Sequence, residues 1–322
     1  MKLTNEQIKS VTIGALWSEE NENGLQFFKC TPKQIDAWFA VSETLGKRAK
    51  TASGIRLDFH TNAKELRFTC GTTGKYEVLI NNLLRVRYRV GKEVEVGEEI
   101  VCPICDPLGN PLEEARVTLC MPSHSYGALK SVELDDGAYI RPHEYDCKLL
   151  MIGDSITQGW DTTYDTFSYA YILSRALNAN SVMQAIGGAF FYEDSLDEID
   201  FDPDIVTVAY GTNDFSNRKS FEEFSNHMTK FLDGIQKMYA SKKVFVITPI
   251  WRGNTASAIG SFEACRTAIA EAAEARGMIH IDGLDMVPPI PELFADGWLH
   301  PNALGFGFYG ENVTREILKH LK

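Results

Sequence analysis

The sequence predicts two domains: an all-β, jelly-roll-like sandwich over residues 1–145, followed by a three-layer α/β/α domain with a mostly parallel sheet over residues 146–322. The length of 322 residues favours two domains of roughly 150 residues each. Short segments of β-strand composition fill the first half. From Lys148 onward, apolar strands alternate with helical stretches, which is typical of a parallel sheet covered by helices.

The first half carries strand signals without a clear helix. Expected strands, each bounded by turn residues, are 54–60, 65–70, 76–80, 83–90, 93–96 and 115–121. Asn81-Asn82 lies between two of them and predicts a tight hairpin. Apolar and basic residues alternate over 86–90, which indicates a strand with one exposed face. Many short strands without helices predict a sandwich or jelly roll.

The second half alternates between the two kinds of element. Expected strands are 148–152, 181–185, 205–209, 244–248 and 278–281, and expected helices are 169–177, 221–239, 261–276 and 305–320. Open α/β sheets bind ligands beyond the carboxyl ends of their strands. Polar and glycine-rich segments follow the first three strands, so we expect the functional site at that edge.

Charge and composition restrict the partners. The chain has 32 basic and 44 acidic residues and a net charge of −12, which disfavours nucleic acid and acidic membrane surfaces as partners. The start resembles no signal peptide, and no apolar run reaches transmembrane length. The chain has seven cysteines, an odd number. The lack of a signal peptide and the odd cysteine count together predict a cytoplasmic protein without structural disulfides.

Two cysteines have the spacing of half a zinc site. Cys102 and Cys105 form Cys-x-x-Cys, but no second such pair follows, and Cys120 and Cys147 are isolated in the sequence. We therefore expect scattered, mostly buried thiols and no metal. Neither phosphate-binding glycine fingerprint occurs, so no nucleotide or other cofactor is predicted.

Gly153-Asp154-Ser155-Ile156-Thr157 directly follows an apolar strand and places one serine where a strand meets a loop. A serine hydroxyl needs a base, a group that orients the base, and donors for the oxyanion. His300, in a short connection near the end of the chain, is the candidate base toward Ser155, and Asp296 is the candidate orienting acid. The oxyanion donors would be the Ser155 amide, an amide of the Gly187-Gly188 pair, and the Asn213 side chain.

Position 157 is threonine where the α/β-hydrolase elbow requires glycine. The four ordered segments instead resemble the SGNH (GDSL-type) hydrolases over about the last half of the chain. The resemblance implies Ser155 as nucleophile, Gly188 and Asn213 as oxyanion donors, and His300 as base, with Gly187 as a substitute for Gly188. The family usually places its acid three residues before the histidine, but that position is Gly297 here and Asp296 lies four before. A backbone carbonyl, Asp285 or Glu292 are the alternatives to Asp296.

A β-sandwich before such a domain is similar to two-domain carbohydrate esterases that remove acetyl groups. This implies a serine esterase acting on acetyl esters of a small molecule or oligosaccharide. Trp160, Trp251 and Trp298 are candidate sugar platforms, with packing in the core or between the domains as the alternative. The alternative activities are a lipid, aryl or thioester acyl hydrolase or an acyltransferase. A carbohydrate-binding protein with a silent hydrolase domain is the alternative of another class.

Overall fold

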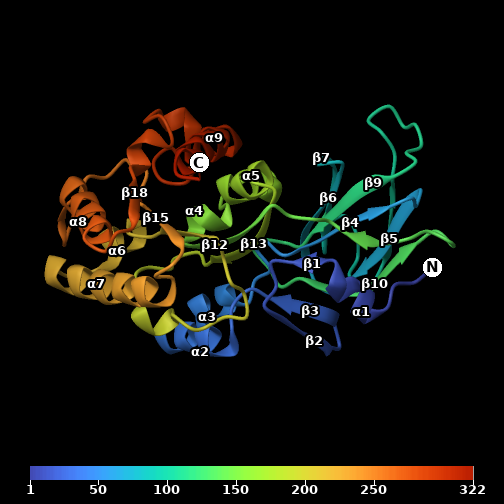
Figure 1. Ribbon diagram of the computed structural model, residues 1–322, viewed down its shortest axis with the longest axis horizontal. Coiled ribbons are helices and arrows are strands. Elements are labelled where there is room, and N and C mark those ends of the chain that lie inside the picture. The colour runs from blue at the N-terminus through green and yellow to red at the C-terminus, as the bar shows by residue number, and fades with distance from the viewer. Residues whose placement is uncertain (322) are drawn as a thin grey trace. The chain divides into compact units, whose positions relative to one another are not determined.

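The computed structural model describes residues 1–321 and divides into two compact units (Figure 1). The first unit comprises Met1–Cys30 and Lys50–Tyr145, and the second comprises Thr31–Ala49 and Asp146–Lys322. Residues 31–49 therefore group with the second unit, whereas the sequence analysis assigned them to the β domain.

The first unit is a sandwich of two antiparallel sheets. The order of one sheet is β1-β4-β9-β6-β7, with β11 paired to β4, and the order of the other is β2-β3-β10-β5-β8. The strands are β1 (Thr12–Ile13), β2 (Trp17–Asn21), β3 (Gly24–Phe28), β4 (Arg56–Thr61), β5 (Glu65–Cys70), β6 (Gly74–Ile80), β7 (Leu83–Val90), β8 (Glu99–Pro103), β9 (Ala115–Cys120), β10 (Ala128–Leu134) and β11 (Arg141–Pro142). Side chains of both sheets, such as Phe59 and Phe68, share one buried hydrophobic core. The predicted β-sandwich is confirmed.

Two local predictions in this unit, a hairpin and a strand, have different outcomes. Asn81 and Asn82 have φ values of 52° and 64° and join β6 to β7, as the hairpin prediction requires. The strand expected over 93–96 is wrong, because this segment is a turn in which only Val94 makes an isolated bridge to Val90. Gly91 and Gly97 both have positive φ values and turn the chain on either side of it.

Two helices that the sequence analysis did not predict occupy 31–49. Helix α2 (Pro32–Val41) begins with a capping box between Thr31 and Gln34, and α3 (Glu43–Ala49) follows after Ser42. The buried side-chain amide of Gln34 donates to Gln184 and to the carbonyl oxygen of Ser195. These contacts join the helix pair to the rest of the second unit.

The second unit contains a five-stranded parallel sheet of order β13-β12-β14-β15-β18. Its strands are β12 (Cys147–Gly153), β13 (Ala179–Ala185), β14 (Ile205–Ala209), β15 (Lys243–Ile247) and β18 (Ile279–Ile281). The long helices are α5 (Tyr169–Ala176), α7 (Phe221–Met238), α8 (Phe262–Glu274) and α9 (Ala303–Lys319). Helices α5 and α9 lie on one side of the sheet, and α7 with the α2–α3 pair lies on the other (Figure 1). The predicted three-layer α/β/α fold is confirmed.

Smaller elements complete the chain. They are helices α1 (Asn5–Ser10), α4 (Ser155–Gln158) and α6 (Thr212–Asn217), the two-stranded β16 (Ala256–Ser257) and β17 (Gly260–Ser261), and the 3-10 turns η1 (Asp165–Phe167), η2 (Glu193–Ser195), η3 (Gly283–Asp285) and η4 (Pro291–Leu293). None of the helices in the described residues has the length and apolarity needed to cross a bilayer.

Candidate active site

The strand register brings three of the predicted segments to one edge of the sheet. Gly153, the last residue of β12, pairs with Ala185 of β13 and with Ala209 of β14. The segments that carry Ser155, Gly187-Gly188 and Asn213 therefore leave the sheet at the same level. This edge is the carboxyl end of a parallel sheet, where such folds place their ligands.

Ser155 is the first residue of α4, and its side chain meets the imidazole of His300. The distance from Ser155 Oγ to His300 Nε2 is 3.0 Å, within hydrogen-bond reach. The Asp154 carboxylate accepts from the amide of Ile156 at 2.9 Å and thereby caps α4. The serine is thus held on a strand-to-helix turn with its hydroxyl toward a candidate base.

The four-residue spacing between Asp296 and His300 produces a well-ordered turn. Oδ1 of Asp296 accepts from the amides of Trp298, Leu299 and His300 at 3.0, 2.8 and 3.1 Å, and Gly297 turns the chain with φ +79°. Oδ2 lies 3.1 Å from Nδ1 of His300. Partial burial raises the pKa of Asp296, but the three amides and His300 outweigh it and hold this pKa below its usual value.

The segment after β13 is held in place by side chains from two other helices. Gly188 has φ +89°, a conformation that L side chains rarely adopt. Gln158 Oε1 accepts from the amide of Gly187 at 2.7 Å and from Trp160 Nε1 at 3.1 Å. Nη1 of Arg48, from α3, donates to the carbonyl oxygen of Gly187 at 2.7 Å. The peptide groups that flank Gly187 are therefore fixed by side chains on both sides.

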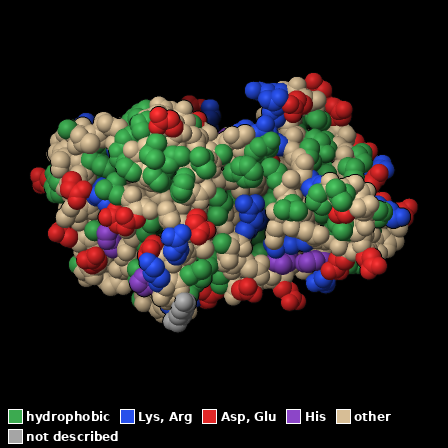
Figure 2. All heavy atoms as spheres, turned by 90° about the horizontal axis from the view of Figure 1, so that it is seen from above, with side chains coloured by type: hydrophobic (Ala, Val, Ile, Leu, Met, Phe, Trp, Pro, Cys, Tyr) green, Lys and Arg blue, Asp and Glu red, His purple; other side chains and the backbone are tan. Residues whose placement is uncertain are grey.

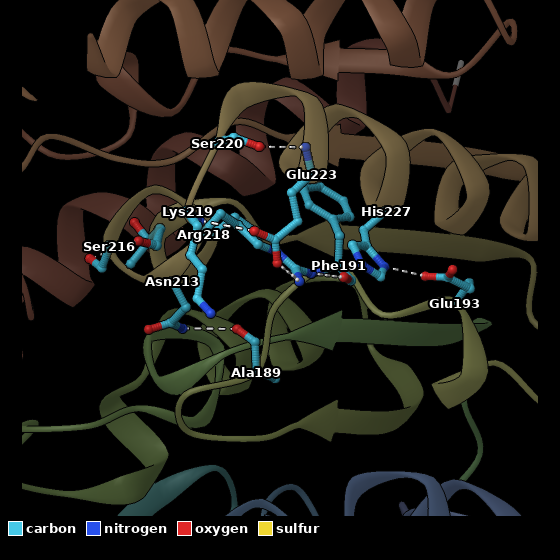
Figure 3. A network of polar contacts seen from close by, with 12 residues as sticks. Ala189, Phe191, Glu193, Asn213, Ser216, Arg218, Lys219, Ser220, Glu223 and His227 are labelled. Atoms are coloured by element: carbon cyan, nitrogen blue, oxygen red, sulfur yellow. Dashed lines mark hydrogen bonds and ion pairs between the residues drawn. The ribbon is translucent and has the colours of Figure 1, made fainter. Parts of the chain in front are cut away.

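Asn213 lies in the first turn of α6, which begins after Gly211 with φ +116°. Its Nδ2 donates to the carbonyl oxygen of Ala189 at 2.8 Å (Figure 3). The same nitrogen lies 3.4 Å from Oδ2 of Asp154, which is long for a hydrogen bond. The two contacts hold the Asn213 amide next to the residue that precedes Ser155.

A buried ion pair ties the Asn213 helix to the glycine segment. Arg218 pairs with Asp214 at 3.2 Å and donates to the carbonyl oxygen of Phe191 at 2.6 Å, while the other oxygen of Asp214 accepts from the amide of Phe191 at 3.2 Å. Figure 3 shows Arg218 reaching from the end of α6 toward Phe191 and Glu223. Burial raises the pKa of Asp214 to about 6 and that of Asp154 to about 7.

The three tryptophans have different environments. The Arg48 guanidinium lies 4.7 Å from the ring centre of Trp160, which stacks at 6.1 Å on the His300 ring, so this indole is largely enclosed. Trp251 is half-buried and packs against Phe294. Trp298 keeps 42% of its surface exposed and is two residues from His300.

Sequence reasoning missed Arg48, Gln158 and Asp161. Asp161 lies 3.3 Å from Nδ1 of His300. Gln158 and Asp161 are within six residues of Ser155, and this proximity was the available signal, whereas the position of Arg48 gave none. The acidic side chains next to His300 are those of Asp161 and Asp296. Among the described residues, neither Asp285 nor Glu292, the alternatives to Asp296, forms an ion pair with His300.

The same cluster is the only potential metal-ligand group among the described residues. Nδ1 of His300 and one carboxylate oxygen each of Asp161 and Asp296 lie within 4.8 Å of one another. A metal on Nδ1 would leave a proton on Nε2, the nitrogen that faces Ser155, and would block the base. Both carboxylates lie within 3.3 Å of the same nitrogen, Nδ1 of His300. All seven cysteines are free thiols.

A family model and solved structures match this chain. The model of the GDSL-like Lipase/Acylhydrolase family matches residues 151–307, and a search of curated proteins found no significant match. Similar structures include the salicylyl-acyltransferase SsfX3 from a tetracycline biosynthetic pathway, with a TM-score of 0.78, 17% identity and coverage of 96% of this chain and 94% of that one. A putative GDSL-like lipase from Bacteroides ovatus has a TM-score of 0.75 and 19% identity, and the match covers 100% of this chain and 98% of that one.

The third similar structure is a family two carbohydrate esterase from Clostridium thermocellum in complex with cellohexaose. Its TM-score is 0.64 and its identity 17%, and the match covers 84% of this chain and 94% of that one. At such identities the likeness establishes the fold. Residues 151–307 therefore match the GDSL-like lipase/acylhydrolase family, whose name describes hydrolysis of carboxylic esters, and the chain shares its fold with these three structures.

Proposed function

We propose that this protein is a serine esterase that removes acetyl groups from a carbohydrate through an acyl-enzyme intermediate. The observation that carries the proposal is the continuous chain of contacts from Ser155 Oγ through the His300 imidazole to Asp296, at 3.0 and 3.1 Å. A nucleophile, its base and an orienting acid within hydrogen-bond reach are the parts that acyl transfer requires.

The proposed reaction begins with proton transfer from Ser155 Oγ to Nε2 of His300 as Oγ bonds to the ester carbonyl carbon. The carbonyl oxygen becomes an oxyanion, stabilised by the amides of Ser155 and Gly188 and by the Asn213 side chain. The imidazolium then protonates the departing alcohol oxygen, which leaves the acyl group on Ser155. Water, deprotonated by His300, attacks this acyl-enzyme and releases the acid.

Two features support a small acyl group on a neutral sugar. Trp160 is held beside the serine by Gln158 and Arg48, which narrows the space next to the glycine segment. Trp298 offers an exposed indole beside the base, and such a surface suits the apolar face of a sugar ring. The net charge of −12 also favours an uncharged substrate.

A second candidate is acyl transfer to an alcohol other than water. The structural match to a salicylyl-acyltransferase, with a TM-score of 0.78, favours it. Leu304 and Phe308 of α9 are exposed and would suit an apolar acceptor or acyl group. Hydrophobic side chains gather on the face seen from above in Figure 2, on the side of the molecule where Figure 1 places α5 and α9.

The proposal is tested by substrate preference. Rates of acid release are compared for p-nitrophenyl acetate, butyrate and octanoate and for an acetylated xylo-oligosaccharide. We expect activity on the acetyl substrates, with a decline as the acyl chain lengthens. A preference for octanoate would replace the proposal with a lipid-type acyl hydrolase. Faster product formation with an added acceptor alcohol, giving a new ester, would favour the acyltransferase. Oligosaccharide binding without any hydrolysis would favour a carbohydrate-binding protein.

A further inference from the structure

Two carboxylates, one more than a catalytic triad needs, face Nδ1 of His300. Oδ2 of Asp296 lies 3.1 Å from this nitrogen and Oδ2 of Asp161 lies 3.3 Å from it. The two aspartates come from different elements: Asp161 follows α4, and Asp296 follows η4. Their meeting at one ring nitrogen is a product of the fold and not of a local sequence motif.

The backbone after α4 directs Asp161 to this position. Gly159 ends α4 with φ +84°, and Asp161 itself has φ +67°, a left-handed conformation that aspartate tolerates better than most residues. Between them, Trp160 stacks on the His300 ring at 6.1 Å. This short turn thus places an indole against the imidazole and a carboxylate beside Nδ1.

The two aspartates are held differently. Oδ1 of Asp296 accepts from three backbone amides, and its Oδ2 is the hydrogen-bond partner of Nδ1. The side chain of Asp161 is 46% exposed and makes an ion pair with the same nitrogen. Asp296 therefore fixes the orientation of the ring, and Asp161 adds a second negative charge from the solvent side.

We propose that Asp161 is a second positioning residue of His300, which stabilises the imidazolium form and takes over the Nδ1–H hydrogen bond when Asp296 is absent. The inference rests on the proposed function. When Oγ of Ser155 bonds to the carbonyl carbon and its proton moves to Nε2, the proton on Nδ1 stays there and the ring carries a full positive charge. Two nearby carboxylates lower the energy of that charged state more than one does.

The charged groups near His300 are Asp161, Asp296 and Arg48. The two carboxylates lie at Nδ1, and the Arg48 guanidinium lies against Trp160, which stacks on the imidazole ring. A partly exposed carboxylate that acts through its charge contributes less to the rate in high salt, where such charges are screened. A role of Asp161 that is only structural would not depend on salt in this way.

The test is a double-mutant cycle with Asp161→Asn, Asp296→Asn and the double variant. The control is Asp200→Asn, which neutralises an exposed aspartate of the same unit. The measurement is kcat/KM for p-nitrophenyl acetate from pH 5 to 9, at low and high salt, with thermal unfolding as a check on folding. The amide keeps the shape of the side chain, removes its charge and replaces one acceptor oxygen by an N–H donor.

We expect Asp161→Asn to lower the plateau of kcat/KM by about 3- to 10-fold, an effect that weakens in high salt because the carboxylate is partly exposed. Asp296→Asn should lower the plateau of kcat/KM by about 10- to 100-fold. This loss is smaller than the roughly 10⁴-fold fall in kcat that follows the same change in a triad with a single acid. The fold-loss in kcat/KM of the double variant should exceed the product of the two single fold-losses, because each carboxylate compensates for the absence of the other.

The inference is overturned if Asp161→Asn matches Asp200→Asn at every pH and the double variant matches Asp296→Asn. That outcome differs from failure of the proposed function, which would appear as hydrolysis that survives in Ser155→Ala. With a Ser155-dependent wild type, the cycle therefore reports on Asp161 alone.

Discussion

Nη1 of Arg48 donates a 2.7 Å hydrogen bond to the carbonyl oxygen of Gly187, although the two residues are 139 positions apart in the sequence. The same guanidinium lies 4.7 Å from the ring centre of Trp160, which stacks on His300. Arg48 lies on α3, outside residues 151–307 that match the family model. The helix pair of residues 31–49 is thus part of the proposed catalytic machinery and not only of its surroundings.

Arg48→Ala should lower kcat by about tenfold, because the peptide that presents the Gly188 amide loses a charge-assisted hydrogen bond. Lys47→Ala is the matched control, since the adjacent side chain is exposed and pairs with Glu43 of the same helix. Steady-state kinetics with p-nitrophenyl acetate measures both. Equal kcat values for the two variants would show that Arg48 does not order the glycine segment.

Asn213→Ala should lower kcat by a factor that corresponds to about 2–4 kcal/mol of lost transition-state stabilisation, with little change in KM. The Nδ2 donor is lost, and its bond to Ala189 is lost with it. Asn217→Ala, at the exposed end of the same helix, is the control. A variant with wild-type kcat would exclude Asn213 from the oxyanion site.

Arg218→Ala should destabilise the fold by about 3–5 kcal/mol, because it leaves the carboxylate of Asp214 buried without its charge partner. Urea unfolding followed by circular dichroism measures the loss. The control is Arg315→Ala, which removes an exposed i,i+4 ion pair with Glu311. It should lower the free energy of unfolding by at most about 1 kcal/mol. If the two variants unfold at the same urea concentration, the buried pair has no special contribution.

Asp154 should make the stability of the protein depend on pH. Burial raises its pKa to about 7 in the native state, from an ordinary value of 3.8. The native protein therefore holds a proton that the unfolded chain has already lost. The stabilising contribution is full below pH 4 and is lost as the pH rises to about 7.

Asp154→Asn should reduce this dependence. Between pH 4 and 7 the unfolding free energy of the variant should fall less than that of the wild type, by about 3 kcal/mol. Some dependence should persist, because burial also raises the pKa of Asp214, to about 6. Urea unfolding at intervals across this range measures the slope, with exposed Asp200→Asn as the control. Parallel curves for all three proteins would contradict the assignment.

The sequence predicted the sheet and the site core because their signals are local. Ser155 follows an apolar strand, and the glycine and asparagine segments follow the next two, so the register of a parallel sheet brings them together. The helix pair at 31–49 was missed even though Thr31, Pro32 and Gln34 carry a helix-start signature. The signature was not used, and no element was predicted before residue 54.

The contacts of Arg48 and Asp161 are tertiary, so the sequence carried no signal for Arg48 and only nearness to Ser155 for Asp161. Arg48 is an ordinary arginine in the last turn of a short helix, and only packing of α3 on the rest of the second unit brings it to Gly187. Asp161 depends on its own left-handed conformation, which aspartate tolerates but does not require. The spacing of Asp296 appeared one residue too long, but the turn through Gly297 brings its carboxylate to His300.

The central claim is that Ser155 is the nucleophile. The most direct test is the rate of p-nitrophenyl acetate hydrolysis by the wild type and Ser155→Ala, with half-buried Ser257→Ala, in the β16–β17 pair, as a control for the substitution. The account predicts that Ser155→Ala loses at least about 10³-fold in kcat while Ser257→Ala keeps the wild-type rate. Hydrolysis by Ser155→Ala at the wild-type rate would contradict it.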